Sequence, residues 1–169
     1  MKSNQSQLKR RIRNQLIFFI VALLLSGLTA FPIETELQLV SANFSQAPQQ
    51  LKEWIHTVYL AVRNTNDHYP YLSYGTDWLA FAHIVIAVAF IGPLKDPVRN
   101  IWVIQFGMIA CAMVFPLAFI AGGVRGIPFF WQLIDCSFGV VGFVVLYKCF
   151  RDILTLEKMI PGSVSREGY

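Results

Sequence analysis

The sequence predicts an all-α, integral membrane four-helix bundle with an amphipathic helix that caps its outer side. Three apolar runs, 77–94, 101–121 and 127–147, are each about as long as the ~20 helical residues that cross a hydrocarbon layer of ~30 Å. Only 14% of the 169 residues are charged, against roughly 25% in a soluble domain. The third observation is the distribution of basic residues along the chain.

Eleven of the 14 Lys and Arg residues fall into three clusters: five in the first thirteen residues, two in the 95–99 turn and four after Tyr147. The other three are Lys52, Arg63 and Arg125. If the N-terminus is cytoplasmic and each apolar run crosses once, the eleven lie inside and the three outside, as the positive-inside rule requires. The pI near 9.1 therefore indicates topology, and we expect no nucleic acid partner.

The first part of the chain is a basic tail, residues 1–15, which we expect on the anionic cytoplasmic leaflet. Residues 16–31 form the first span. This apolar stretch is short for a span and about as long as the core of a signal peptide. Leu28 is large where a cleavage site needs a small residue, so the sequence favours a retained helix over a cleaved one.

Residues 32–76 are the only sizeable region between spans, and we expect them on the outer side. Within this region, 49–64 carries apolar residues at helical spacing on one face and polar residues on the other. A shorter helix is expected over 33–40. Both are too short and too charged to span, so they lie on the surface or cap the bundle. Three tyrosines in 64–76 are typical of an interfacial aromatic belt.

The second and third spans, 77–94 and 101–121, form a hairpin through the 95–99 turn. The third span carries a stripe of small residues, which lets helix backbones approach closely. Pro116 should kink this helix or free a carbonyl. Residues 122–126, rich in glycine, are expected to be a tight outer turn.

The fourth span, 127–147, is followed by a basic cytoplasmic tail, 148–169. Cys111, Cys136 and Cys149 are the only cysteines, and they lie within or at the ends of apolar runs. They therefore indicate no disulfide framework. The sequence also lacks a CxxC motif, which argues against a thiol oxidoreductase.

Two ionisable residues fall inside the predicted hydrocarbon region, His83 and Asp135. Each is about six residues below the outer end of its helix, so at 1.5 Å per residue both lie roughly 9 Å deep. Asp135 shares a helix face with Gln132, Gly139 and Gly142. This face must point into the bundle, because a lipid-facing carboxylate costs a few kcal/mol. We therefore predict that His83 and Asp135 pair, directly or through water.

The predicted ligand-binding residues surround this pair at the outer mouth: His83, Asp135, Arg125, Asp77, Gln132 and Tyr74. His83 and Asp135 are also the catalytic candidates, as an acid or base and the group that orients it. A haem with two axial histidines would need a second intramembrane histidine. His56, Asp67 and His68 match no metal-ligand spacing, so no metal or cofactor is predicted.

The leading hypothesis is a non-enzymatic membrane subunit or binding protein, whose outward-facing pocket holds a lipid-like or small ligand or docks a partner. Its partners would be membrane lipids, another membrane protein or a second copy of the chain. A membrane enzyme that uses His83 and Asp135 on a lipid-soluble substrate is the first alternative, and an oligomeric transporter protomer the second. A further alternative is that the His83–Asp135 pair has only a structural role and holds two helices together. We expect a bacterial inner (plasma) membrane and cytoplasmic termini.

Overall fold

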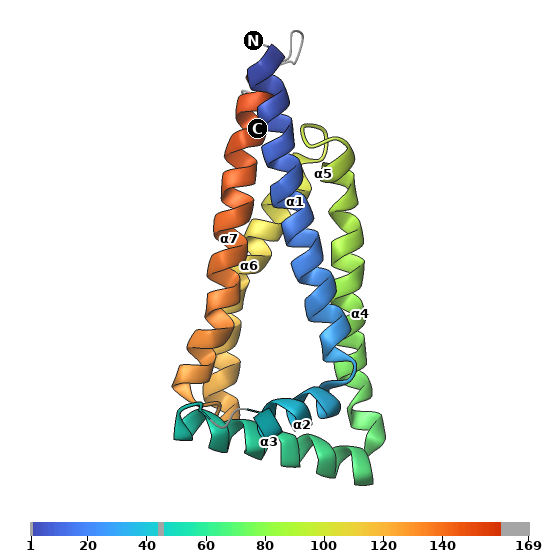
Figure 1. The fold of residues 1–169 in the computed structure, drawn as a ribbon, viewed down its shortest axis with the longest axis vertical. Helices are drawn as coiled ribbons and strands as arrows, with labels where there is room; N and C mark the ends of the chain where they lie inside the picture. The colour runs from blue at the N-terminus through green and yellow to red at the C-terminus, as the bar shows by residue number, and fades with distance from the viewer. Residues whose placement is uncertain (1, 44–45, 160–169) are drawn as a thin grey trace. The chain divides into compact units, whose positions relative to one another are not determined.

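The computed structural model describes residues 2–43 and 46–159. Within these residues, all regular secondary structure is helical (Figure 1). The all-α prediction is therefore confirmed. The elements, in chain order, are α1 (Lys2–Ala30), α2 (Ile33–Asn43), α3 (Gln49–His68), the 3₁₀ helix η1 (Pro70–Leu72), α4 (Tyr74–Ala89), α5 (Ile91–Lys95), α6 (Ile101–Arg125) and α7 (Phe129–Lys158).

In the described part of the chain, four helical segments are long and apolar enough to cross a membrane: Asn4–Ala30, Pro70–Lys95, Ile101–Arg125 and Phe129–Lys158. The prediction of a membrane protein with transmembrane helices is thus confirmed. α1 and α7 have 29 and 30 residues, which makes each about 45 Å long at 1.5 Å per residue. Both exceed a hydrocarbon layer of about 30 Å, so part of each helix must lie outside it.

The segments that the sequence assigned to basic tails are helical where they are described. α1 already begins at Lys2 and α7 continues to Lys158. The remainder of the expected C-terminal tail, 160–169, lies outside the described residues. The basic residues at both ends of the chain therefore extend the membrane helices, at least up to Lys158.

The chain divides into two compact units. The loop unit is Ala22–Ala87. The hairpin unit contains the chain up to Val21 and from Val88 onward, and α6 and α7 are its main elements.

Within the hairpin unit, α6 and α7 pack closely because glycines lie at their contact. A Cβ atom on Gly139 would lie 2.8 Å from the backbone carbonyl oxygen of Cys111, and one on Gly142 would lie 2.8 Å from the Cys111 Sγ. A Cβ atom on Gly107 would lie 2.7 Å from both Leu146 and Phe90. Small residues let helix backbones approach where a larger side chain would hold them apart. The small-residue stripe expected in the third span therefore includes residues at a close helix contact.

The first half of α1 belongs to the same unit and carries some of its most buried side chains. Ile12 and Leu16 are almost completely buried, and the Phe19 ring lies 4.7 Å from the Phe90 ring between centroids. Near the start of α1, the Gln5 side-chain amide donates to the backbone carbonyl of Met159, just after the end of α7, at 2.8 Å. The spacing of these apolar residues gives the otherwise basic segment a buried face, which anchors it.

Within the loop unit, a polar network joins α2 and α3 to the segment before α4. The Asn66 side-chain amide on α3 donates to the Glu34 carboxylate on α2 at 2.6 Å. The Asn66 side-chain oxygen in turn accepts from the Ser73 hydroxyl, which lies between η1 and α4. Asn66 therefore ties α2 and α3 to the start of α4. α3 extends to His68, four residues beyond the expected 49–64 helix, and these added residues include Asn66.

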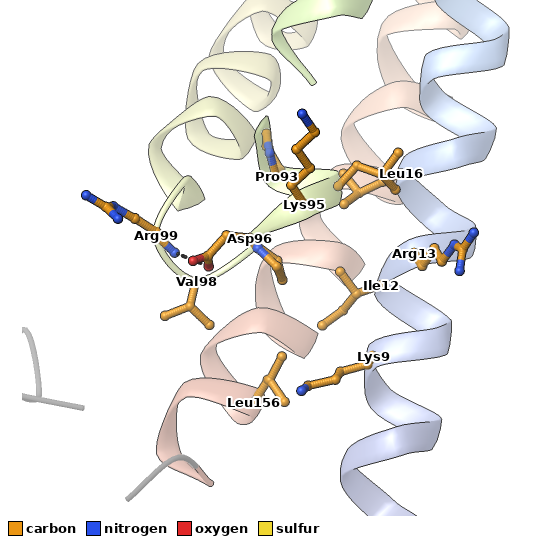
Figure 2. Close-up of a pocket in the computed structure, with 12 residues that line it drawn as sticks. Lys9, Ile12, Arg13, Leu16, Pro93, Lys95, Asp96, Val98, Arg99 and Leu156 are labelled. Atoms are coloured by element: carbon orange, nitrogen blue, oxygen red, sulfur yellow. Dashed lines mark hydrogen bonds between the residues drawn. The ribbon is translucent and has the colours of Figure 1, made fainter. Parts of the chain in front are cut away.

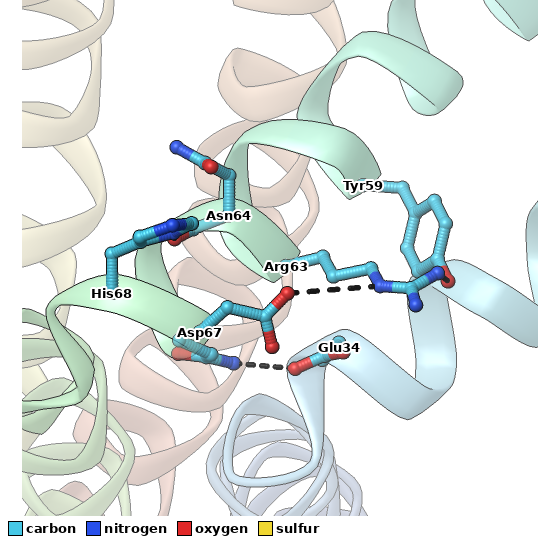
Figure 3. A network of polar contacts seen from close by, with 7 residues as sticks. Glu34, Tyr59, Arg63, Asn64, Asp67 and His68 are labelled. Carbon is cyan, nitrogen blue, oxygen red and sulfur yellow. Dashed lines mark hydrogen bonds and ion pairs between the residues drawn. The ribbon is translucent and has the colours of Figure 1, made fainter.

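The exposed face of the last turns of α3 carries an ion pair between Arg63 and Asp67, with 4.0 Å between Nε and Oδ2 (Figure 3). Arg63 also donates to the Tyr59 hydroxyl at 3.4 Å. This hydrogen bond, with smaller contributions from the charges of Tyr59 and Asp67, raises the pKa of the Arg63 guanidinium above its ordinary value. Because these side chains are exposed, water screens their interaction and it contributes little to stability.

The last turns of α1 pack against α4 through a second glycine contact, also within the loop unit. A Cβ atom on Gly27 would lie 2.8 Å from the Ala80 carbonyl oxygen and 3.2 Å from the His83 Cβ. Ala80 and Ala87 are buried and lie on the same face of α4. Gly27 is therefore required where α1 meets α4.

We predict that Gly139→Ala lowers the stability of the protein. The added methyl group meets the Cys111 backbone carbonyl, which cannot turn away, so α6 and α7 must separate. The expected cost is about 1–3 kcal/mol, measured by unfolding in mixed detergent micelles. Gly123→Ala on α6 is the control, since nothing lies within 4 Å of its Cβ position and alanine favours a helix. Equal stability changes in the two variants would contradict the close contact.

Candidate functional site

A cavity of about 290 Å³ lies in the α6–α7 hairpin near the turn that joins the two helices. This volume approaches the range of small-molecule sites, which are mostly apolar with a few polar groups. Apolar side chains form most of the wall and polar groups of Arg125, Gln132 and Asp135 complete it. The lining residues are Val114, Leu117, Ala118, Ala121, Gly122, Arg125, Ile127, Gln132 and Asp135.

The turn at one end of the cavity differs from the expected 122–126 turn, because α6 continues to Arg125. Gly126 alone has a left-handed backbone, with φ of 66°. The Ile127 amide donates to the Gly122 carbonyl at 2.9 Å and the Gly126 amide to the Gly123 carbonyl at 3.3 Å, which makes a Schellman motif. A glycine at this position ends the helix without strain and sends the chain directly into α7.

Gln132 closes the same end of the cavity and is buried, with 7% of its surface exposed. Its side-chain amide donates to the Ile127 carbonyl at 2.8 Å. A Cβ atom on Gly122 would lie 2.8 Å from the Gln132 side-chain carbonyl carbon, so the glutamine occupies the space that this glycine leaves. Gln132 therefore locks the turn and forms part of the cavity wall.

Asp135 lies one helical turn further along α7 and is half-buried in the cavity wall. Within the described residues, its carboxylate has no hydrogen bond or ion pair. Arg125 lines the same cavity but forms no ion pair with Asp135 in the described part of the structure. A carboxylate in apolar surroundings is costly unless a cation, a hydrogen-bond donor or a proton compensates it. A ligand with a cationic or hydrogen-bond-donating group would therefore find a partner in the Asp135 carboxylate.

The other three predicted binding residues, His83, Asp77 and Tyr74, lie on α4 in the loop unit. Asp77 is half-buried on the first turn of the helix. Tyr74 is exposed, with its ring edge-to-face against Trp78 at 6.0 Å between centroids. The structure therefore brings Arg125, Gln132 and Asp135 together at one cavity, while the pairing of His83 with Asp135 stays a prediction.

The hydrogen bonding of His83 limits how it can pair. Its Nδ1 lies 2.8 Å from the Leu79 carbonyl oxygen, which can only accept a hydrogen bond. Nδ1 therefore carries the hydrogen, and Nε2 is left for another partner. A pair with Asp135 must then use Nε2, either as an imidazolium that donates to a carboxylate or as a neutral ring that accepts from a protonated carboxyl group.

No group of three or more His, Cys, Asp or Glu side chains suited to a metal ion occurs among the residues that the structure describes. The chemistry at the cavity is that of one carboxylate and one guanidinium in an apolar wall. Comparisons with protein-family models, with curated proteins and with solved structures find no match to this chain.

Sequence reasoning missed a second and larger pocket, which four basic side chains line: Lys9, Arg13, Lys95 and Arg99. Along the sequence, these residues indicate topology. A detectable signal was present, since Lys9 and Arg13 alternate with Ile12 and Leu16 at helical spacing, which predicts adjoining basic and apolar faces. The convergence of α1 with the 95–99 turn could not be predicted from this spacing.

We predict that Gln132→Met weakens the turn. Methionine has a similar volume but cannot donate to the Ile127 carbonyl, so the expected loss is about 1–2 kcal/mol of unfolding free energy. Gln105→Met on the exposed part of α6 is the matched control, with an expected change within about 0.5 kcal/mol. If the two variants unfolded alike in detergent, the locking role of Gln132 would be wrong.

Proposed function

We propose that this chain is a multi-pass, non-enzymatic membrane protein whose α6–α7 cavity binds a small or lipid-like ligand. The ligand would present a cationic or hydrogen-bond-donating group to Asp135 and an apolar body to the rest of the wall. The same cavity would bind a membrane-embedded segment of a partner subunit only if that segment presented a cationic or hydrogen-bond-donating group to Asp135.

The observation that carries this proposal is the state of Asp135. The carboxylate lines a cavity, lies among apolar side chains and has no partner among the described residues. Gln132, one turn away on the same face, is by contrast satisfied by the Ile127 carbonyl. An intramembrane carboxylate without a protein partner is by default a functional group, because its cost in stability needs compensation.

The cavity also supports binding over catalysis. Its polar wall residues are Arg125, Gln132 and Asp135, and Gln132 is already engaged in holding the turn. These residues include no nucleophile with an adjacent base, which covalent catalysis needs. A carboxylate and a guanidinium suffice to orient a polar ligand.

We propose that both termini face the cytoplasm and that the α6–α7 turn faces outward, in a bacterial inner membrane. In the hairpin unit, basic residues from α1, the 95–99 turn and the end of α7 line two neighbouring pockets. Arg125 lies at the other end of α6 from this basic group. This asymmetry supports an inward basic end by the positive-inside rule.

We predict that Ala118→Leu blocks the cavity. The larger side chain fills apolar space in the wall and leaves Arg125, Gln132 and Asp135 unchanged. The measurement is untargeted mass spectrometry of the compounds that co-purify with the protein in detergent. A compound class held by the wild type should fall at least about fivefold in this variant, which corresponds to roughly 1 kcal/mol of binding energy.

The control is Ala110→Leu, the same change at an exposed position of α6 outside the cavity. It should retain the compound at the wild-type level. Asp135→Asn should reduce retention as Ala118→Leu does, because it removes the charge from the wall. The absence of any compound enriched over the detergent blank, or equal retention by all variants, would contradict the binding function.

We also predict that His83 and Asp135 are energetically coupled through a bridging water molecule, which is compatible with a carboxylate that has no direct partner among the described residues. In a double-mutant cycle of His83→Ala and Asp135→Ala, the expected coupling is about 0.5–1.5 kcal/mol of unfolding free energy. Val85 is exposed two residues from His83, so Val85→Ala combined with Asp135→Ala should give additive effects. Additivity in both cycles would rule out the pair and leave the α6–α7 cavity to act alone.

A further inference from the structure

One pocket among the described residues has a basic rim and an apolar floor. It has a volume of about 580 Å³ and lies between the first half of α1, the 93–99 segment and the end of α7. All of these segments belong to the hairpin unit. The floor is made by Ile12, Leu16, Pro93 and Leu156, all nearly or completely buried.

The charge of the lining is mainly positive. Lys9 and Arg13 come from α1, and Lys95 and Arg99 come from the turn before α6, against the single acidic side chain of Asp96. Within the part of the chain that the structure describes, these four basic side chains form no ion pair. Figure 2 shows the Lys9 side chain reaching across the pocket toward Leu156. The flexible stems of Lys95 and Arg99 allow their charged ends to fold over a bound group.

The one carboxylate is already engaged. Asp96 accepts a hydrogen bond from the Arg99 backbone amide at 3.0 Å (Figure 2). The Asn100 side-chain amide donates to the Asp96 backbone carbonyl at 2.9 Å and to the Gly92 carbonyl at 3.2 Å. These bonds fix the turn, so the backbones that carry Lys95 and Arg99 are held in place on one side of the pocket.

Helix length places the pocket around one edge of the hydrocarbon layer. Counting about 20 residues back from Ala30, the hydrocarbon part of α1 begins near Arg11, between Lys9 and Arg13. The same count forward from Phe129 places the end of the hydrocarbon part of α7 near Lys148, so Leu156, eight residues further along, lies outside the hydrocarbon. A ligand here would have its charge among the basic residues and its chains beside the helices.

We propose that this pocket binds the phosphate headgroup of an anionic phospholipid, with the phosphate among Lys9, Arg13, Lys95 and Arg99. A basic pocket between membrane helices at the interface has the chemistry that recognises such headgroups. The buried apolar floor contacts the glycerol and the first acyl carbons, which a soluble anion lacks. This site is separate from the α6–α7 cavity, and neither its geometry nor its test depends on Asp135.

The test measures stabilisation of the full chain in dodecyl maltoside by added dioleoyl-phosphatidylglycerol. This lipid should raise the unfolding temperature, whereas dioleoyl-phosphatidylcholine, with the same chains and no net charge, should not. Arg13→Gln/Lys95→Gln should raise the half-saturating concentration of phosphatidylglycerol at least about tenfold. Inorganic phosphate at matched ionic strength should neither stabilise the protein nor compete.

The control is Arg10→Gln/Lys158→Gln, which also removes one Arg and one Lys charge, here from α1 and from the end of α7. Both residues are exposed and line neither basic pocket. Its response to phosphatidylglycerol should stay within about threefold of the wild type. If the pocket variant is less stable without lipid, the number of phosphatidylglycerol molecules retained in native mass spectrometry replaces the thermal measurement.

Three outcomes would overturn the proposal. Equal stabilisation by phosphatidylcholine would mean that the headgroup charge is not recognised. Equal weakening in the control variant would mean that the basic residues act as a diffuse surface charge. Stabilisation by inorganic phosphate with competition against the lipid would identify a site for a soluble anion.

Discussion

The close approach of α6 and α7 is the constraint on which the candidate site depends. Between apolar helices in lipid there is little hydrophobic driving force, so van der Waals contact and hydrogen bonds must hold them together. Gly139 and Gly142 allow α7 to touch the Cys111 residue of α6 directly, and Gln132 locks the turn at the end of the hairpin. With the helices fixed at both places, alanines such as Ala118 leave space between them unfilled, and this space is the cavity.

Gln132 and Asp135 show how position decides the role of a polar side chain within a membrane helix. They are three residues apart on one face of α7, and both border the same cavity. Gln132 reaches a backbone carbonyl that the helix turn leaves exposed, so its cost of burial is offset. Asp135 can only accept when ionised, and no donor of the described residues reaches it, so its cost remains. The first is a structural residue, and the second is the group on which the proposed binding function rests.

The basic residues have one role along the sequence and a second one in the folded hairpin unit. Along the chain they form separate clusters, which is the arrangement that sets the orientation of membrane helices. In the hairpin unit, members of two clusters, from α1 and from the 95–99 turn, line one pocket with an apolar floor. Positive charges that the sequence separates into clusters thus also create a local positive field at this pocket.

The sequence by itself determined the helical class, the apolar segments and the small residues of the helix contact, because length, composition and spacing fix these locally. It also placed Arg125, Gln132 and Asp135 near one another, since they flank a single turn. Helix ends were less well determined, because Gly122 and Gly123 stay helical and α6 ends only at the left-handed Gly126. Only the tertiary structure decided that Ile12 and Leu16 bury a face of a basic helix and that Lys9 and Arg99 line one pocket, since these arrangements join residues far apart in the chain. No local pattern encodes which distant segment fills the space beside a helix.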